Sequence, residues 1–171
     1  MAYLNQEMQF DEVRWATYRK ASYDARLSFT GEPRKVLLPA RTRLCRLVPL
    51  FGGNPFESPW WMPKETFESM IGVNQRAAHG SGAQLRNLLV EGLALPSNNQ
   101  LSVVVIELDT PVFAWQGLAS RLKLREGKDR PGGLMQIYLP RLGERGQPGW
   151  SPYAHLLETY WIKFAAPGSQ R

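Results

Sequence analysis

Residues 100–108, QLSVVVIEL, limit the possible folds of this chain more than any other segment. The run is rich in β-branched side chains and almost continuously apolar, and turn-forming residues flank it at 96–99 and 109–111. A short apolar run with these boundaries predicts a strand that is buried on both faces. We therefore expect it to run through the middle of a sheet.

Other segments show the periodicities of strands and helices. Apolar side chains between Leu4 and Ala25 recur at helical spacing, which predicts an amphipathic N-terminal helix. We also expect strands at 42–48, 111–116, 134–139 and 160–164, helices at 64–71 and 83–95, a structured loop at 51–63 and a charged loop at 122–131. Segregated strands and helices predict an α+β fold. We expect one domain (1–171), with an N-terminal helical segment (1–30) followed by a mostly antiparallel split sheet, and we expect the core that binds the substrate to span 35–165.

Composition excludes several classes of protein. One cysteine among 171 residues rules out an intramolecular disulfide, and two histidines cannot supply a zinc site of the usual Cys/His kind, so no metal is expected. The apolar runs are too short to span a bilayer, and residues 1–7 lack the pattern of a cleavable signal peptide. We expect synthesis in the cytoplasm, with delivery to another cell by a signal-independent route left open.

Charge and motifs narrow the chemistry further. The net charge of +6 favours anionic partners. No nucleophile elbow, P-loop or His-Glu-x-x-His pair is present, so no motif supports a hydrolase, kinase or metalloprotease function. Cys45 lies in an apolar strand pattern, where a free cysteine is usually a small buried hydrophobe. Glu107 is the carboxylate to check as a substitute catalytic group, although a strand-end role fits it better.

Three features occur in an order that fits the binding of NAD. An arginine on the first principal strand, Arg46 or alternatively Arg43, can clamp a pyrophosphate through its rigid fork of donors. Indole rings can stack on a nicotinamide or base, and a side-chain amide can hold a ribose hydroxyl. The residues that supply these functions are Ser58, Trp60, Trp61 and Trp115 for the pocket wall and Gln136 for the amide. Together they fit an enzyme that binds NAD and stretches its N-glycosidic bond.

The same residues resemble a known superfamily. The strand arginine, the aromatic loop, the segment PVFAWQG at 111–117 and the segment GGLMQIYLP at 132–140 look like the ADP-ribosyltransferase and NAD-glycohydrolase toxins, over roughly residues 38–164. The resemblance implies that Arg46 contacts the NAD phosphates and that Gln136 stands where many members have a glutamate. A neutral amide cannot stabilise a cation by charge, and some members that hydrolyse NAD are similar in using glutamine there, which favours NAD cleavage over protein modification. The resemblance also implies a bacterial toxin or effector that has an immunity or delivery protein. If ADP-ribose is transferred, it implies a macromolecular acceptor as well.

Two other functions remain open at this point. The stretch 121–145 carries seven basic and three acidic residues and, with Trp150 and Tyr153 as stacking rings, could bind nucleic acid. A non-catalytic assembly protein could instead use exposed tryptophans as a partner surface. Structural explanations are also open for the proposed site, since Gln136 could face solvent, Arg46 could lie on an edge strand, and tryptophans are most often core residues.

Overall fold

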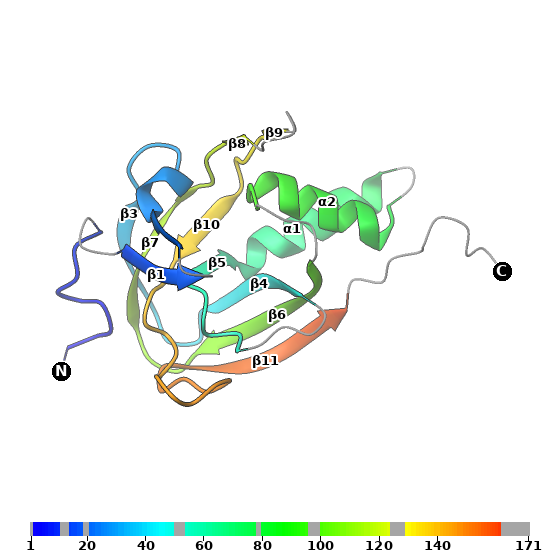
Figure 1. Cartoon of the computed structure of the whole chain (residues 1–171). Helices are drawn as coiled ribbons and strands as arrows, with labels where there is room; N and C mark the ends of the chain where they lie inside the picture. Colours follow the sequence, from blue (N-terminus) through cyan, green and yellow to red (C-terminus); the bar gives the residue numbers. More distant parts are fainter. Residues whose placement is uncertain are drawn as a thin grey trace.

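The apolar run at 100–108 forms strand β6, Gln100–Leu108, which is paired on both sides. In a computed structural model of the chain (Figure 1), the described residues are 2–10, 14–18, 21–49, 54–77, 80–95, 100–123 and 129–161. A seven-stranded sheet has the order β11-β6-β4-β5-β10-β7-β3, and each pair of neighbouring strands in it is antiparallel. Its central strand is β5, so β6 lies one strand from the edge and the expected middle position is wrong.

The remaining strands of this sheet come from both halves of the chain. They are β3 Arg34–Leu38, β4 Arg43–Pro49, β5 Trp60–Pro63, β7 Val112–Leu118, β10 Met135–Tyr138 and β11 Ala154–Trp161. The strands expected at 42–48, 111–116 and 134–139 are confirmed with small shifts at their ends. The last strand begins at Ala154, earlier than expected, and residues 162–164 of the expected range lie outside the described residues. The predicted α+β class with a mostly antiparallel sheet is therefore confirmed.

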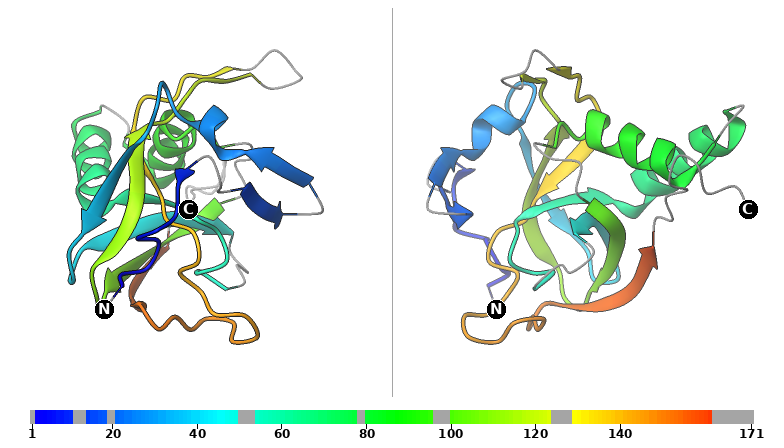
Figure 2. Two further views of the ribbon diagram at one scale, coloured as in Figure 1. Left: turned by 90° about the vertical axis from the view of Figure 1, so that its left-hand side faces the viewer. Right: turned by 45° about the vertical axis from the view of Figure 1, so that its right-hand side comes forward.

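The sheet curls around a core to which all seven strands contribute. Leu38 of β3 and Val112 of β7 belong to the same buried cluster as Leu108 of β6 and Ala154 of β11, although these strands stand at opposite ends of the sheet. Leu44 of β4 lies in this cluster with an exposed fraction of 0%. The two views of Figure 2 show β3 and β7 crossing the direction of β4 and β6. We call the side that encloses this cluster the concave face.

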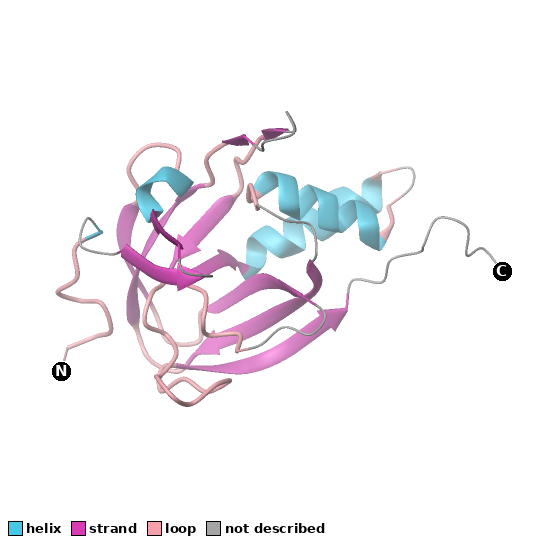
Figure 3. Cartoon of the chain, viewed as in Figure 1, coloured by secondary structure: helices cyan, strands magenta, loops and turns pink. Residues whose placement is uncertain are grey.

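Two helices cover part of the opposite, convex face (Figure 3). Helix α1, Lys64–Arg76, and helix α2, Gly82–Gly92, confirm the helices expected at 64–71 and 83–95. They pack on side chains that alternate with those of the concave face: Cys45, Leu47, Met62, Val103 and Val105, which meet Phe67 of α1 and Leu89 of α2. The Ser81 hydroxyl begins α2 by accepting a hydrogen bond of 3.2 Å from the backbone N–H of Gln84.

The predicted N-terminal helix is wrong. Most of residues 2–10 lie in turns and loop, and Leu4 forms an isolated bridge with Val112. The described residues that follow form strand β1, Arg14–Tyr18, strand β2, Ala21–Asp24, and a 3₁₀ helix, η2, Ala25–Ser28. Antiparallel pairing brings Trp15 opposite Tyr23. The strand preference of Trp15, Tyr18 and Tyr23 outweighs an apolar spacing that also fits a helix. The charged loop expected at 122–131 contains two paired short strands, β8 Leu122–Lys123 and β9 Asp129–Arg130, with 124–128 outside the described residues.

Gly132 and Gly133 connect β9 to β10 and differ in their surroundings. Both have positive φ, +73° and +96°, but a Cβ on Gly132 would lie 2.4 Å from the Ala119 carbonyl oxygen, whereas a Cβ on Gly133 would meet nothing within 4 Å. Both alanine variants carry the backbone strain of a left-handed residue, and only Gly132→Ala adds overpacking. We predict that Gly132→Ala lowers the free energy of unfolding by about 1–3 kcal/mol more than Gly133→Ala. Urea denaturation of both variants measures this difference, and equal losses would contradict the packing.

Candidate functional site

Side-chain alternation on β5 and β10 separates the residues that the sequence predicts to act together. Trp60 is paired with Tyr138 and Trp61 with Ile137. Ile137 and Trp61 belong to the core of the concave face, whereas Tyr138 and Trp60 belong to a separate cluster on the convex face. Successive residues of a strand point to opposite faces, so Trp60 and Trp61 cannot line one pocket.

An aromatic cluster occupies the convex face beside the helices. We define it as Phe10, Phe29, Trp60, Trp115 and Tyr138. Tyr138 is fully buried, and its ring centroid lies 4.8 Å from that of Trp60, 5.7 Å from that of Phe10 and 6.3 Å from that of Trp115. Tilted and edge-on contacts at these separations are the favourable arrangements for aromatic rings. This aromatic cluster therefore brings the predicted residues Trp60 and Trp115 to one face.

Gln136 lies on the same face, two residues before Tyr138. It is only 6% exposed and is paired across the sheet with Gly117, where a Cβ would lie 2.8 Å from the Phe29 ring. Its amide Nε2 donates a hydrogen bond to the carbonyl oxygen of Ser28, at the end of η2. That bond uses one of the two N–H groups of the amide and leaves its carbonyl oxygen as an acceptor. The expectation that Gln136 faces solvent is thus wrong.

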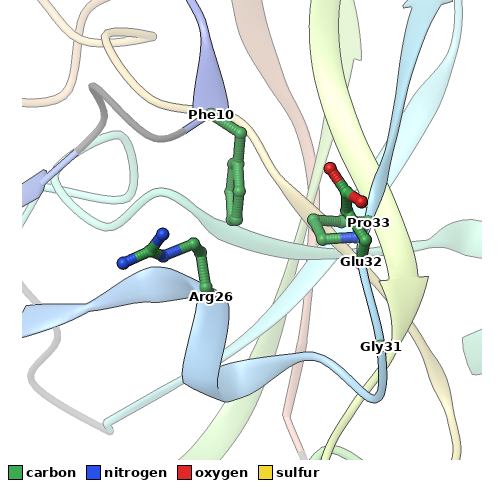
Figure 4. A pocket seen from close by; sticks show the side chains of 5 residues that line it. All are labelled: Phe10, Arg26, Gly31, Glu32 and Pro33. Atoms are coloured by element: carbon green, nitrogen blue, oxygen red, sulfur yellow. The ribbon is translucent and has the colours of Figure 1, made fainter.

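A pocket adjoins the aromatic cluster. Its lining residues are Phe10, Arg26, Gly31, Glu32 and Pro33, and its volume is about 330 Å³ (Figure 4). Phe10 belongs both to the pocket and to the aromatic cluster, and Arg26 stands in η2 two residues before Ser28. The volume is within the range of about 300–1,000 Å³ that small-molecule sites occupy. No local motif marks Phe10, Arg26 and Glu32, and the sequence analysis missed all three.

Arg46 lies on the other face of the sheet. It alternates with Cys45 and Leu47 and shares the concave face with Leu44 and Val48. Its Nη1 donates to the carbonyl oxygen of Pro55 at 2.7 Å, and its guanidinium carbon stands 5.5 Å from the centroid of the Trp61 ring. Burial lowers the pKa of Arg46 to about 10, which still leaves it charged at neutral pH. The expected convergence of Arg46 and Gln136 on one crevice is not found.

Ser58 and Arg43, like Arg46, form their hydrogen bonds with groups other than Gln136. The Ser58 hydroxyl accepts a hydrogen bond of 3.3 Å from the backbone N–H of Trp60, and the Ser58 carbonyl accepts one of 3.5 Å from Arg46. Arg43 points away from the concave face and pairs with Glu107, with 3.0 Å between Nε and Oε2. That ion pair gives Glu107 the strand-end role expected for it. Arg46 lies on the concave face, and Arg43 lies next to Leu44, which is paired with Pro63 at the end of β5, so neither arginine stands beside Trp60.

The basic stretch 121–145 does not form one surface among its described residues. Arg121 pairs with Asp129 on the β8–β9 hairpin, whereas Arg141 and Arg145 line a second pocket of about 520 Å³ together with Tyr153. Figure 1 shows the hairpin at one end of β10 and the segment that follows Tyr138 at the other. The positive charges are therefore divided between two ends of the molecule.

Among the described residues, Cys45 is buried and His155 pairs with a surface aspartate. Burial raises the pKa of the Cys45 thiol to about 12, so it stays protonated and unreactive at neutral pH. His155 Nδ1 lies 2.7 Å from Asp109 Oδ1 at the surface, and His79 is outside the described residues. Within the described ranges, no group of three His, Cys, Asp or Glu side chains could hold a metal ion, and no helix is long and apolar enough to cross a membrane.

Comparison with known proteins gives two structural likenesses. No protein-family model matches the chain, and no curated protein matches it. Rhs1-CT, solved in complex with cognate immunity protein RhsI1, is similar over 77% of this chain and 83% of its own, with 16% identity and a TM-score of 0.49. Tne2, solved in complex with Tni2, is similar over 76% of this chain and 97% of its own, with 14% identity and a TM-score of 0.39.

The environment of Arg46 predicts a structural effect of its removal. Arg46→Ala takes away a charged donor and leaves the Pro55 carbonyl without that partner, which we expect to lower the free energy of unfolding by about 2 kcal/mol or more. Arg43→Ala removes an ion pair whose arginine side chain is 45% exposed, and its loss is expected to stay below about 1 kcal/mol. Thermal and urea unfolding of the two variants measure both values. Equal stabilities would show that Arg46 does not hold residues 55–58 against β4.

Proposed function

We propose that this chain is an NAD-consuming enzyme, with NAD as its substrate and hydrolysis as its main reaction. The observation that carries the proposal is the placement of Gln136. A buried side-chain amide lies on the face that holds Trp60 and Trp115, and the aromatic cluster of that face continues into a pocket lined by Arg26 and Glu32. The predicted amide and two of the predicted indole rings thus share one face.

The chemistry requires orientation more than covalent work. In NAD hydrolysis the bond between the nicotinamide nitrogen and the ribose C1′ breaks, and its electron pair leaves with nicotinamide. A water oxygen then bonds to C1′ and releases a proton to solvent, which yields ADP-ribose. The transition state resembles an oxocarbenium ion, so groups that hold the ribose and the leaving ring in line accelerate the reaction.

Gln136 is the residue to which we assign contact with the ribose. Its carbonyl oxygen accepts a hydroxyl hydrogen bond, while its Nε2 is oriented by the Ser28 carbonyl. Because the amide is buried, entry of the substrate requires the Ser28–Phe29 segment to move away from β10. An uncharged amide orients the ribose without stabilising a positive charge, and this favours water over a protein acceptor. Transfer of ADP-ribose to a macromolecule is the less supported branch of the proposal.

The resemblance to NAD-consuming toxins extends the proposal to the biological role. We assign the chain a role as a bacterial toxin or effector that is produced with an immunity protein and delivered to another cell. The two alternative functions have less support. The basic stretch is divided in space. Trp150, 47% exposed, is the one strongly exposed tryptophan among the described side chains, so the indole rings do not gather into a partner surface.

Gln136→Met tests the assignment because methionine keeps the volume and removes the amide. We predict a fall of about 100-fold or more in the rate of nicotinamide release, the size expected when one positioned polar group is lost. The measurement is nicotinamide release from NAD by purified protein, followed by chromatography.

Asn74→Leu is the matched control. Asn74 is also a buried amide, and its Nδ2 donates to the Ser81 carbonyl at 3.1 Å, but it lies on α1 away from the aromatic cluster. Its replacement is expected to lower stability and to leave the rate per folded molecule unchanged. Wild-type protein that releases no nicotinamide, or Gln136→Met with full activity, would overturn the proposal.

A further inference from the structure

We propose that the pocket lined by Phe10, Arg26 and Glu32 binds the adenosine diphosphate half of the dinucleotide, and that Glu32 makes it select NAD over NADP. This inference rests on the proposed function and assigns the part of the substrate that Gln136 does not contact. It concerns three residues that no motif marks.

The pocket has the three chemical groups that an adenosine diphosphate requires. Phe10 supplies an aromatic surface for a base, Arg26 a guanidinium for phosphate oxygens, and Glu32 a carboxylate for ribose hydroxyls. Figure 4 shows the Arg26 guanidinium and the Glu32 carboxylate on opposite sides of the Phe10 ring. A ligand that stacks on Phe10 can therefore meet a cation on one side and an anion on the other.

Continuity with Gln136 supports the assignment to the same substrate. Arg26 and Ser28 belong to η2, and the Ser28 carbonyl accepts the hydrogen bond from Gln136. The Phe10 ring lies 5.8 Å from Phe29 and 5.6 Å from Trp115, centroid to centroid. The pocket and the buried amide thus share η2 and the aromatic cluster, as two parts of one elongated site would.

The backbone fixes both walls of the pocket. Pro33 is buried and its ring fixes its own φ, which restricts the turn that carries Glu32, and Gly31 before it adopts a left-handed φ of +73°. On the other side, Lys35 Nζ donates to the carbonyl oxygens of Gln6 at 2.6 Å and Met8 at 2.8 Å. These bonds tie the segment before Phe10 to β3 and place its ring beside the pocket.

Selectivity follows from the charge of Glu32. A carboxylate accepts hydrogen bonds from the 2′- and 3′-hydroxyls of the adenosine ribose of NAD, as acidic residues do in other dinucleotide sites. NADP carries a phosphate on the 2′-oxygen, and two negative groups at such short range repel each other. The wild-type chain should therefore hydrolyse NAD with a higher kcat/KM than NADP.

Glu32→Gln tests this selectivity, because it removes the charge and keeps the size. We expect wild-type protein to favour NAD over NADP at least 10-fold in kcat/KM, and Glu32→Gln to reduce that preference to about threefold or less, mainly through faster use of NADP. Glu65→Gln, which neutralises an exposed carboxylate on α1, is the matched control and should leave the preference unchanged. Circular dichroism confirms that the variants are folded.

Binding of ADP-ribose provides a readout that does not require turnover. Arg26→Gln is expected to weaken ADP-ribose binding at least 10-fold by calorimetry. If wild-type protein hydrolyses NAD but Glu32→Gln keeps its preference and Arg26→Gln keeps its affinity, the pocket assignment is overturned and the proposed function stands. If ADP-ribose binds in a manner that depends on Arg26 but NAD is not cleaved, the pocket assignment stands and the hydrolase fails. If ADP-ribose does not bind at all, the pocket assignment is overturned, and nicotinamide release alone decides the proposed function.

Discussion

The alternation of side chains along β4, β5 and β10 decides which residues of this chain can act together. These adjacent strands of the curled sheet send every second side chain into the concave core and the others to the convex face. The concave side is filled by apolar groups from all seven strands, together with the Arg46 stem and Trp61. The convex side carries the aromatic cluster and Gln136. A site built on this sheet must draw its residues from one face.

Much of the fold could be predicted because its signals are local. The β-branched run at 100–108 and the helical spacings after Pro63 and Ser81 act within single elements, and the structure confirms those elements. The N-terminal region could not be predicted from spacing, since Trp15 and Tyr18 fit one side of a helical wheel and are also paired in a strand. The strands that pair with β6 could not be predicted either, because the order of strands in a sheet depends on contacts between residues distant in sequence.

The candidate site was predictable only in part. Gln136, Trp60 and Trp115 have the residue types that NAD binding needs, and register on β5, β7 and β10 brings them to one face. Arg46 has the right chemistry as well, but the face it occupies depends on how β4 pairs with β6, which its neighbours in sequence do not reveal. Arg26 and Glu32 become part of the candidate site because Lys35 and η2 hold segments that are distant in sequence beside the sheet. No spacing of residues in the sequence predicts these contacts.

The indole N–H resonances of Trp60, Trp61 and Trp115 test the central claim most directly, because these rings report on both faces of the sheet. In a ¹⁵N-labelled sample titrated with ADP-ribose, the account predicts shifts for Trp60 and Trp115 and none for Trp61, whose ring lies in the concave core. Shifts confined to Trp61 and the Arg46 side chain would place the ligand on the opposite face and contradict the account.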